Sequence, residues 1–242
     1  MPSEPKHIVA SFEADLKKLR DMIAAMGGLV ERAVADATTA LLDRNPELAA
    51  RVIENDAQIN AEEHAVEQFA VRLLALRQPV ADDLRHVIQA LKIVTDLERV
   101  GDYAANIAKR SIVINQVASS FTLSGLGQMA RLVQQNLKSS IDTVGEASPE
   151  KAISVWRADQ AVDDLYNTIF RELITYMMED PRNITPCTHL LFIAKNLERI
   201  GDHTTNMAEL TYYAVTGENL PDFRPKGDNT STYVHNVDAD HV

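Results

Sequence analysis

Aromatic residues, glycine and proline are all scarce in this chain of 242 residues. Phe, Trp and Tyr together make up 5% of it, and Gly and Pro occur 9 times each. Sheet proteins are rich in aromatic and β-branched residues and need many turns, whereas the abundant Ala, Leu and Glu of this chain favour helices. The composition therefore predicts an all-α protein.

Cysteine is almost absent, and long apolar runs are missing. The single cysteine, Cys187, cannot form an internal disulfide, so the chain does not need an oxidising compartment. Residues 1–7 are polar, no signal-peptide stretch follows them, and no apolar run approaches the ~18–20 residues that span a bilayer. We expect a cytoplasmic protein that reaches a membrane only through its partners.

Basic residues are outnumbered. The chain has 24 Lys and Arg against 35 Asp and Glu, which gives a net charge of -11. Binding to the backbone of DNA or RNA requires clustered positive charge that displaces counterions from phosphate. Nucleic acid is therefore not an expected partner.

Four proline residues mark where the predicted helices begin or end. Asn45 and Ser148 each precede a Pro and then a Glu, which is the pattern of a helix start. Pro79 and Pro181 interrupt continuous helical patterns, because proline lacks a donor N–H. The predicted helices are at about 7–44, 46–78, 80–117, 124–147, 149–179 and 184–216.

Two segments that lie 100 residues apart share one pattern. Residues 96–109, DLERVGDYAANIAK, and residues 196–209, NLERIGDHTTNMAE, are identical at seven of fourteen positions. The helices before them align at an offset of 103, which pairs Asp56 with Asp159. A duplicated unit explains both alignments. The prediction is two tandem three-helix bundles, at 7–117 and 124–216, with a polar connector at 118–127 and a disordered tail at 217–242.

The third helix of each unit carries a ridge of oxygen-bearing side chains. Residues four apart lie on one face of a helix, so Glu98, Asp102 and Asn106 form a line beside the apolar stripe. The second helix of each unit carries a similar line. The candidate ligands on these four helices are Asp56, Asn60, Glu98, Asp102, Asn106, Asp159, Asp163, Glu198, Asp202 and Asn206.

These lines meet if each pair of helices forms a hairpin. Residues equally distant from Pro79 then lie at one height, which places Asp56 opposite Asp102 and Asn60 opposite Glu98. The same construction about Asp180 and Pro181 pairs the residues of the second half, Asp159 with Asp202 and Asp163 with Glu198. The sequence thus predicts two quartets of carboxylate or amide side chains.

Each quartet needs positive charge, because its carboxylates repel one another. Arg99 and Arg199 would supply it through internal salt bridges, and a metal ion would supply it through coordination. Oxygen ligands favour Mg²⁺, Mn²⁺, iron or Ca²⁺ and disfavour a closed zinc site. The expected cofactor is a divalent or trivalent ion such as iron, manganese, magnesium or zinc, and its identity stays open. The alternative is a solvated acidic face with i,i+4 ion pairs.

The glycines of the ridge and several other side chains also carry predictions. Gly101 and Gly201 lie within helices, where glycine is unfavourable, so another group is expected to approach the backbone closely there. Asp36 is a weak further ligand. His235, Asp238, Asp240 and His241 belong to the tail and are not expected to hold metal. His86, His189 and Cys187 are predicted to be packing or surface residues, and Phe69, Trp156, Phe170 and Phe192 to lie in the core.

The two ridge segments resemble the PhoU family of phosphate-transport regulators, and the resemblance extends over about residues 7–216. It implies two tandem three-helix bundles whose Glu/Asp-x3-Asp motifs bind clusters of iron or other metals. That motif falls on Glu98 with Asp102, Asp159 with Asp163 and Glu198 with Asp202. The fourth instance departs from it, because Asn60 brings an amide, which implies weaker metal binding by the first quartet.

The resemblance further implies a negative regulator of phosphate uptake and of the phosphate-starvation response. Such a protein links the ATPase subunit of a phosphate ABC transporter to a sensor histidine kinase, and we expect a homodimer. Two alternatives stay open. A metal-dependent enzyme, such as a di-iron oxidase or a phosphohydrolase, is disfavoured because the Glu-x-x-His of di-iron bundles is missing after Glu98 and Glu198. A metal-free helical scaffold is the other.

Overall fold

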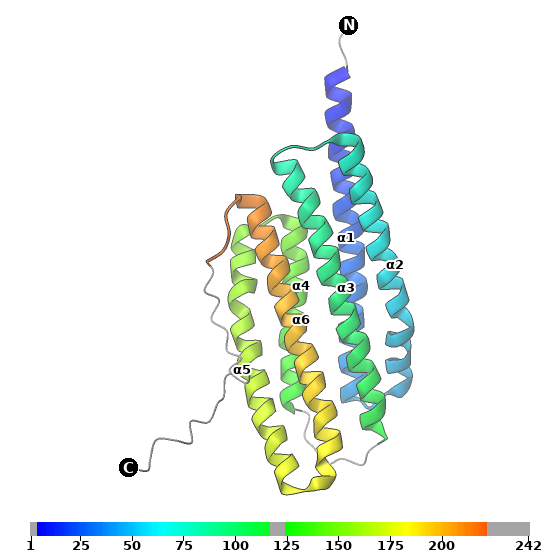
Figure 1. The fold of residues 1–242 in the computed structure, drawn as a ribbon, viewed down its shortest axis with the longest axis vertical. Helices are drawn as coiled ribbons and strands as arrows, with labels where there is room; N and C mark the ends of the chain where they lie inside the picture. Colours follow the sequence, from blue (N-terminus) through cyan, green and yellow to red (C-terminus); the bar gives the residue numbers. More distant parts are fainter. Residues whose placement is uncertain (1–3, 117–123, 222–242) are drawn as a thin grey trace, which may run out of the picture.

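The computed structural model describes residues 4–116 and 124–221, and within these ranges it consists of helices and their connections (Figure 1). The elements are α1 (Glu4–Leu42), α2 (Pro46–Arg77), α3 (Asp82–Asn115), α4 (Ser124–Glu146), α5 (Pro149–Glu179), the short 3-10 helix η1 (Pro181–Asn183) and α6 (Ile184–Thr216). The all-α prediction is confirmed.

The helices begin where the capping residues predicted. The side chain of Asn45 accepts a hydrogen bond from the backbone N–H of Leu48 at 3.0 Å, and that of Ser148 accepts one from Lys151 at 3.3 Å. The residue before each cap, Arg44 or Ala147, has a left-handed φ of 52° or 53°. These turns lie at equivalent places in the two repeats, which is what a duplication predicts.

Some boundaries differ from the prediction. The α2–α3 turn is longer than expected, because Gln78 and Ala81 adopt φ values of 47° and 50° around Pro79 and the next helix begins only at Asp82. Helix α4 begins at Ser124, where the predicted helix 124–147 begins, so residues 124–127 of the predicted connector are helical. The other connector residues, 118–123, and the tail beyond 221 lie outside the described residues.

The two repeats pack side by side through their third helices. Helices α3 and α6 run antiparallel at the centre of the molecule, with α2 and α5 on opposite outer sides (Figure 1). Helices α1 and α4 also touch across the same boundary. One continuous apolar core includes Val30 of α1, Leu97 of α3, Leu137 of α4 and Leu197 of α6. The two bundles therefore form one packed body.

The predicted aromatic core is correct only in part. Phe69 and Phe170 are half-buried against the core, and the indole N–H of Trp156 donates to Glu209 at 3.0 Å. The prediction for Phe192 was wrong, since its side chain is 50% exposed and lies beneath the Arg110 guanidinium at 4.1 Å. Helical spacing places Phe192 near the core stripe, but the cation makes an exposed ring position favourable.

None of the described helices is both long enough and apolar enough to cross a membrane.

Two candidate carboxylate centres

The first candidate centre lies between α2 and α3. Burial raises the pKa of Asp56, and the negative charge of Asp102 raises it further. Burial also raises the pKa of Glu98, again with a contribution from Asp102 and a smaller one from Asp56. The α2–α3 hairpin therefore brings these three carboxylates near enough to repel one another, as its pivot at Pro79 predicted.

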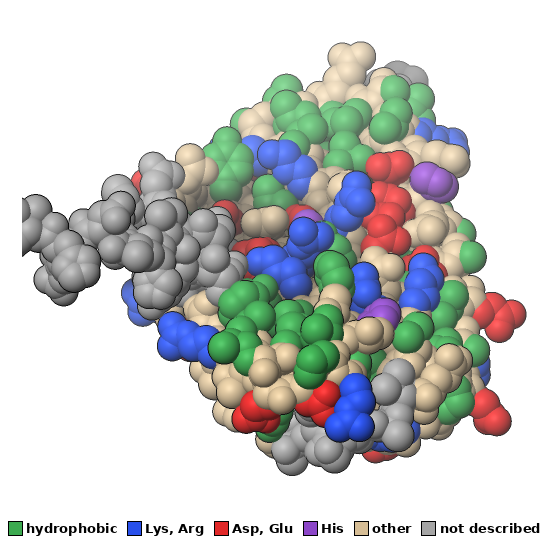
Figure 2. Space-filling model, turned by 60° about the horizontal axis from the view of Figure 1, so that its bottom comes forward, with side chains coloured by type: hydrophobic (Ala, Val, Ile, Leu, Met, Phe, Trp, Pro, Cys, Tyr) green, Lys and Arg blue, Asp and Glu red, His purple; other side chains and the backbone are tan. Residues whose placement is uncertain are grey.

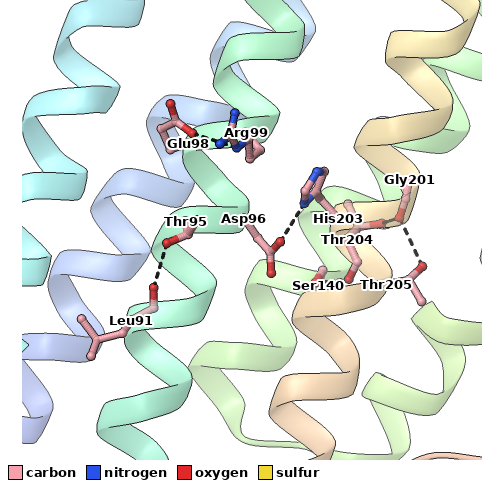
Figure 3. Close-up of polar contacts among 10 residues, drawn as sticks. All are labelled: Leu91, Thr95, Asp96, Glu98, Arg99, Ser140, Gly201, His203, Thr204 and Thr205. Atoms are coloured by element: carbon pink, nitrogen blue, oxygen red, sulfur yellow. Dashed lines mark hydrogen bonds and ion pairs between the residues drawn. The ribbon is translucent and has the colours of Figure 1, made fainter.

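An arginine partly offsets this repulsion. The Nε of Arg99 lies 3.7 Å from Glu98 (Figure 3), and its Nη1 lies 3.9 Å from Asp102. The Arg99 side chain is 56% exposed, so water and ions screen both pairs. The predicted internal salt bridge from Arg99 is thus present in the first centre, but only as a weak contact at its edge.

The second centre, between α5 and α6, is more deeply buried. Asp159, Asp163 and Glu198 are only 1%, 4% and 5% exposed. Burial raises the pKa of Glu198, and the charges of Asp202 and Asp163 add to the rise, although Lys195 opposes it. The Nζ of Lys195 donates to Glu198 Oε1 at 2.8 Å. The cation of this centre is therefore a lysine, while Arg199 lies 5.8 Å from the ring of Tyr103 on the other repeat.

The two ridge glycines allow the hairpins to close. A Cβ at position 201 would lie 2.7 Å from Asp159 Oδ1, and a Cβ at position 101 would lie 3.0 Å from Ile59 Cδ1. The predicted close approach is confirmed at both positions. In the second centre the approaching group is itself a candidate ligand, so the backbone of α6 at Gly201 forms one wall of the site.

The first centre contains one more carboxylate, Glu63, which the four-residue spacing did not indicate. Its pKa is raised by burial and by the nearby charge of Glu67, and the Glu63 charge in turn raises the pKa of Glu98. Seven residues make two helical turns with about 20° of drift, so Glu63 shares a face with Asp56. The four-residue line pointed instead to His64, which is 70% exposed and lies 3.7 Å from Glu67.

Glu63 changes the expected charge of the first centre. Asn60 was expected to leave this centre with one carboxylate fewer than the second. With Glu63 included, each centre has four carboxylates: Asp56, Glu63, Glu98 and Asp102 in one, and Asp159, Asp163, Glu198 and Asp202 in the other. The predicted deficit of charge is therefore made up by a residue on the same helix.

The remaining candidates are exposed or have other contacts. Asn106, Asn206 and Asp36 are exposed, and Asn206 borders the groove between the repeats. Cys187 is buried, as a packing residue would be. His189 lies 3.4 Å from Arg110, and His86 lies 3.4 Å from Gln89. His235, Asp238, Asp240 and His241 lie outside the described residues.

A contact between the repeats separates the two centres. Nδ1 of His203 on α6 and Oδ1 of Asp96 on α3 lie 2.7 Å apart, and both side chains are mostly buried (Figure 3). The ring of His203 also lies 5.6 Å from that of Tyr103. The central helices that carry the ridges are thus fixed to each other.

The donor set of both centres suits an oxygen-preferring cation. Asp56 Oδ1, Asn60 Oδ1 and Glu198 Oε2 are buried and accept no hydrogen bond from the described residues. Buried oxygens of this kind are costly unless a donor or a cation reaches them. In the described part of the chain, however, no three Asp, Glu, His or Cys side chains converge closely enough to hold an ion as they stand. Acidic side chains do gather in a band on the face shown in Figure 2, next to Lys and Arg.

Fold and site together define a class of protein, a duplicated helical bundle with one carboxylate-rich hairpin in each repeat. The PhoU domain matches residues 23–111 and 126–211. The chain therefore belongs to the PhoU family, a family of non-enzymatic accessory and regulatory proteins. The enzyme alternative is set aside on this ground.

Relatives and solved structures agree with this assignment. The chain is 48% identical over 227 residues to the phosphate-specific transport system accessory protein PhoU homolog of Rhizobium meliloti, covering 93% of this chain and 96% of that one. The crystal structure of PhoU from Pseudomonas aeruginosa has a TM-score of 0.83 and 42% identity, over 86% of this chain and 100% of that one. The phosphate transport system regulatory protein PhoU from Streptococcus pneumoniae has a TM-score of 0.81 and 33% identity, over 87% and 99% of the respective chains.

Proposed function

We propose that this chain is a regulatory accessory protein of phosphate-specific transport and that its two carboxylate centres bind metal ions. The regulatory role rests on family membership and on relatives whose names describe such a role over nearly their whole length. The metal rests on one observation in this chain: each repeat sets four carboxylates against each other at the edge of a core, in register.

Bound cations would give each hairpin the positive charge that it lacks. In the first centre Asp56, Glu63, Glu98 and Asp102 would hold the ion, and in the second Asp159, Asp163, Glu198 and Asp202 would do so. Because every ligand is an oxygen, Mg²⁺, Mn²⁺ and iron suit these sites better than a closed zinc site does. The ion would join α2 to α3, or α5 to α6, by replacing repulsion with shared coordination.

In this role the chain would restrain phosphate uptake and the phosphate-starvation response when phosphate is plentiful. Its partners would be the ATPase subunit of a phosphate ABC transporter and the cytoplasmic domains of a sensor histidine kinase. A pull-down with each purified partner, with and without Mn²⁺, tests the link. We expect the chain to retain both partners, and failure to retain either one contradicts the adaptor role.

A metal-free scaffold is the second candidate function. The observation in its favour is that each centre already holds a cationic side chain, Arg99 in the first and Lys195 in the second. Elemental analysis of protein refolded with metal and then desalted distinguishes the two. Retained metal at a fixed ratio supports the proposed centres, and none supports the scaffold. Light scattering of the same sample measures the oligomeric state, for which a homodimer stays a prediction.

A further inference from the structure

The two centres differ most at one pair of positions. At the offset of 100 between the third helices, Lys195 corresponds to Thr95, and at the offset of 103 between the second helices, Tyr166 corresponds to Glu63. Lys195 Nζ lies 5.0 Å from the centre of the Tyr166 ring while it donates to Glu198 at 2.8 Å. Where the first repeat has the hydroxyl of Thr95, the second has the ammonium of Lys195. Where the first has the carboxylate of Glu63, the second has the Tyr166 ring, which contacts that ammonium.

Two groups of the second centre contact the ammonium of Lys195. The carboxylate of Glu198 is 5% exposed, its Oε1 accepts from Lys195, and its Oε2 is buried and accepts no hydrogen bond from the described residues. The face of the Tyr166 ring attracts the same ammonium, and Tyr166 is only 6% exposed. An ammonium held in this way already neutralises part of the negative charge that would attract a metal ion.

The first centre has no such cation at the corresponding position. The hydroxyl of Thr95 is exposed and donates to the carbonyl of Leu91 in its own helix at 3.2 Å (Figure 3). Arg99 approaches Glu98 and Asp102 no closer than 3.7 Å and is 56% exposed. The Lys195 side chain is 34% exposed, but its ammonium donates directly to a ligand oxygen. A screened guanidinium at the rim competes with a metal ion less than such an ammonium does.

We infer that Lys195 is a built-in competing cation of the second centre, so that metal binds first and more tightly to the first centre. This inference rests on the proposed metal-binding function and deepens it. It reverses the order expected from Asn60 alone. A metal ion enters the second centre only when the Lys195 ammonium leaves Glu198. In the first centre Arg99 lies 3.7 Å from Glu98, and Lys109 acts on Asp56 through its charge, so both cations interfere less with the ligand oxygens. The second centre would therefore fill only at higher metal concentration.

The test isolates each centre and titrates it with Mn²⁺, with free Mn²⁺ measured by electron paramagnetic resonance. The second centre is measured in an Asp102→Ala background and the first in an Asp202→Ala background. We expect the first centre to bind more tightly. Lys195→Met should raise the affinity of the second centre by on the order of tenfold, because it removes a unit charge next to the ligands.

Two further variants keep the test independent of folding. Thr95→Lys places the ammonium in the first centre and should lower its affinity by about tenfold, so the expected changes have opposite signs. Lys151→Met is the matched control, because it breaks an exposed ion pair of 2.6 Å with Glu146, outside both centres, and should leave both affinities unchanged. Circular dichroism establishes that each variant is folded.

The possible outcomes distinguish a failure of the role inferred for Lys195 from a failure of the proposed metal binding. An unchanged second-centre affinity in Lys195→Met, or a second centre that binds more tightly than the first, overturns the inference while the metal centres stand. If the unmodified chain binds no Mn²⁺, the metal centres themselves are wrong and the inference falls with them. Opposite shifts in Lys195→Met and Thr95→Lys support both.

Discussion

At the scale of single residues, the chemistry of this protein is governed by carboxylates that the fold holds in unfavourable surroundings. Asp56, Glu63, Glu98 and Glu198 all have a raised pKa, and in each case burial is the largest cause. Neighbouring carboxylates add to the effect. The metal-free protein therefore bears an electrostatic cost at neutral pH, which protons or cations relieve.

This cost predicts how the stability of the metal-free protein depends on pH. A carboxyl whose pKa is higher in the folded state binds more protons there, so stability is lost as pH rises from ~4 through the folded pKa. The double variant Asp56→Asn, Glu98→Gln lacks two such groups. We expect urea unfolding in a metal chelator to give it a stability advantage over the wild-type chain that grows as pH rises above ~4. Glu54→Gln, on the opposite face of α2, is the control, and an advantage that shrinks with pH contradicts the explanation.

The ridge glycine of the second repeat gives a steric prediction. In Gly201→Ala the new methyl would lie 2.7 Å from Asp159 Oδ1, so the α5–α6 hairpin must open or the carboxylate must move. We expect a loss of unfolding free energy of about 1–3 kcal/mol. Gly145→Ala, where nothing lies within 4 Å of the added methyl, should be neutral or stabilising by up to ~1 kcal/mol. Urea denaturation of both variants decides the point, and equal effects would refute it.

At the scale of helices, much of the fold could be predicted because local rules and the duplication agreed. Proline positions and the Asn45 and Ser148 caps located the helix starts, and the hairpin geometry followed from the pivot at Pro79. The exact ends could not be predicted, since the residues with positive φ at the turns, such as Gln78 and Ala81, are not the glycines that signal such turns.

The site was predictable only as far as helical spacing determines it. The ridge acids and their partners on the preceding helix follow from four-residue steps, but Glu63 lies seven residues from Asp56 and His64 fitted the four-residue step better. Lys195 gave no signal either, because a lone lysine on a helix is usually solvated. Its placement depends on the Tyr166 ring, a contact between two helices that the sequence alone does not show.

The turn between α4 and α5 offers a prediction at this scale. Ala147 has a φ of 53°, where a Cβ costs about 1–2 kcal/mol that glycine does not incur. Part of that gain is lost because glycine makes the unfolded chain more flexible. We expect Ala147→Gly to stabilise the protein by up to ~1 kcal/mol in urea unfolding. The control Ala161→Gly, at an exposed position inside α5, should destabilise it by about 1 kcal/mol. A loss of stability in both variants contradicts the assignment of strain.

At the scale of the whole molecule, two copies of one unit share a core but carry different centres. The continuous core and the contact between Asp96 and His203 hold α3 and α6 against each other. Each ridge therefore lies on a helix that packs directly against the ridge helix of the other repeat. The duplication thus places two carboxylate centres of unequal character on one body, and the proposed metal binding would make them two different cation sites.

The most direct test of the central claim is the metal content of the natively purified chain and of its variants. We predict bound metal in the wild-type chain, a loss of one centre's share in Asp102→Ala and in Asp202→Ala, and the loss of both shares in the double variant. Asp21→Ala, which removes an exposed aspartate that is not among the candidate ligands, should keep the wild-type content. Elemental analysis by mass spectrometry gives the ratio of metal to protein. An unchanged ratio in the double variant would contradict the assignment of the carboxylate centres.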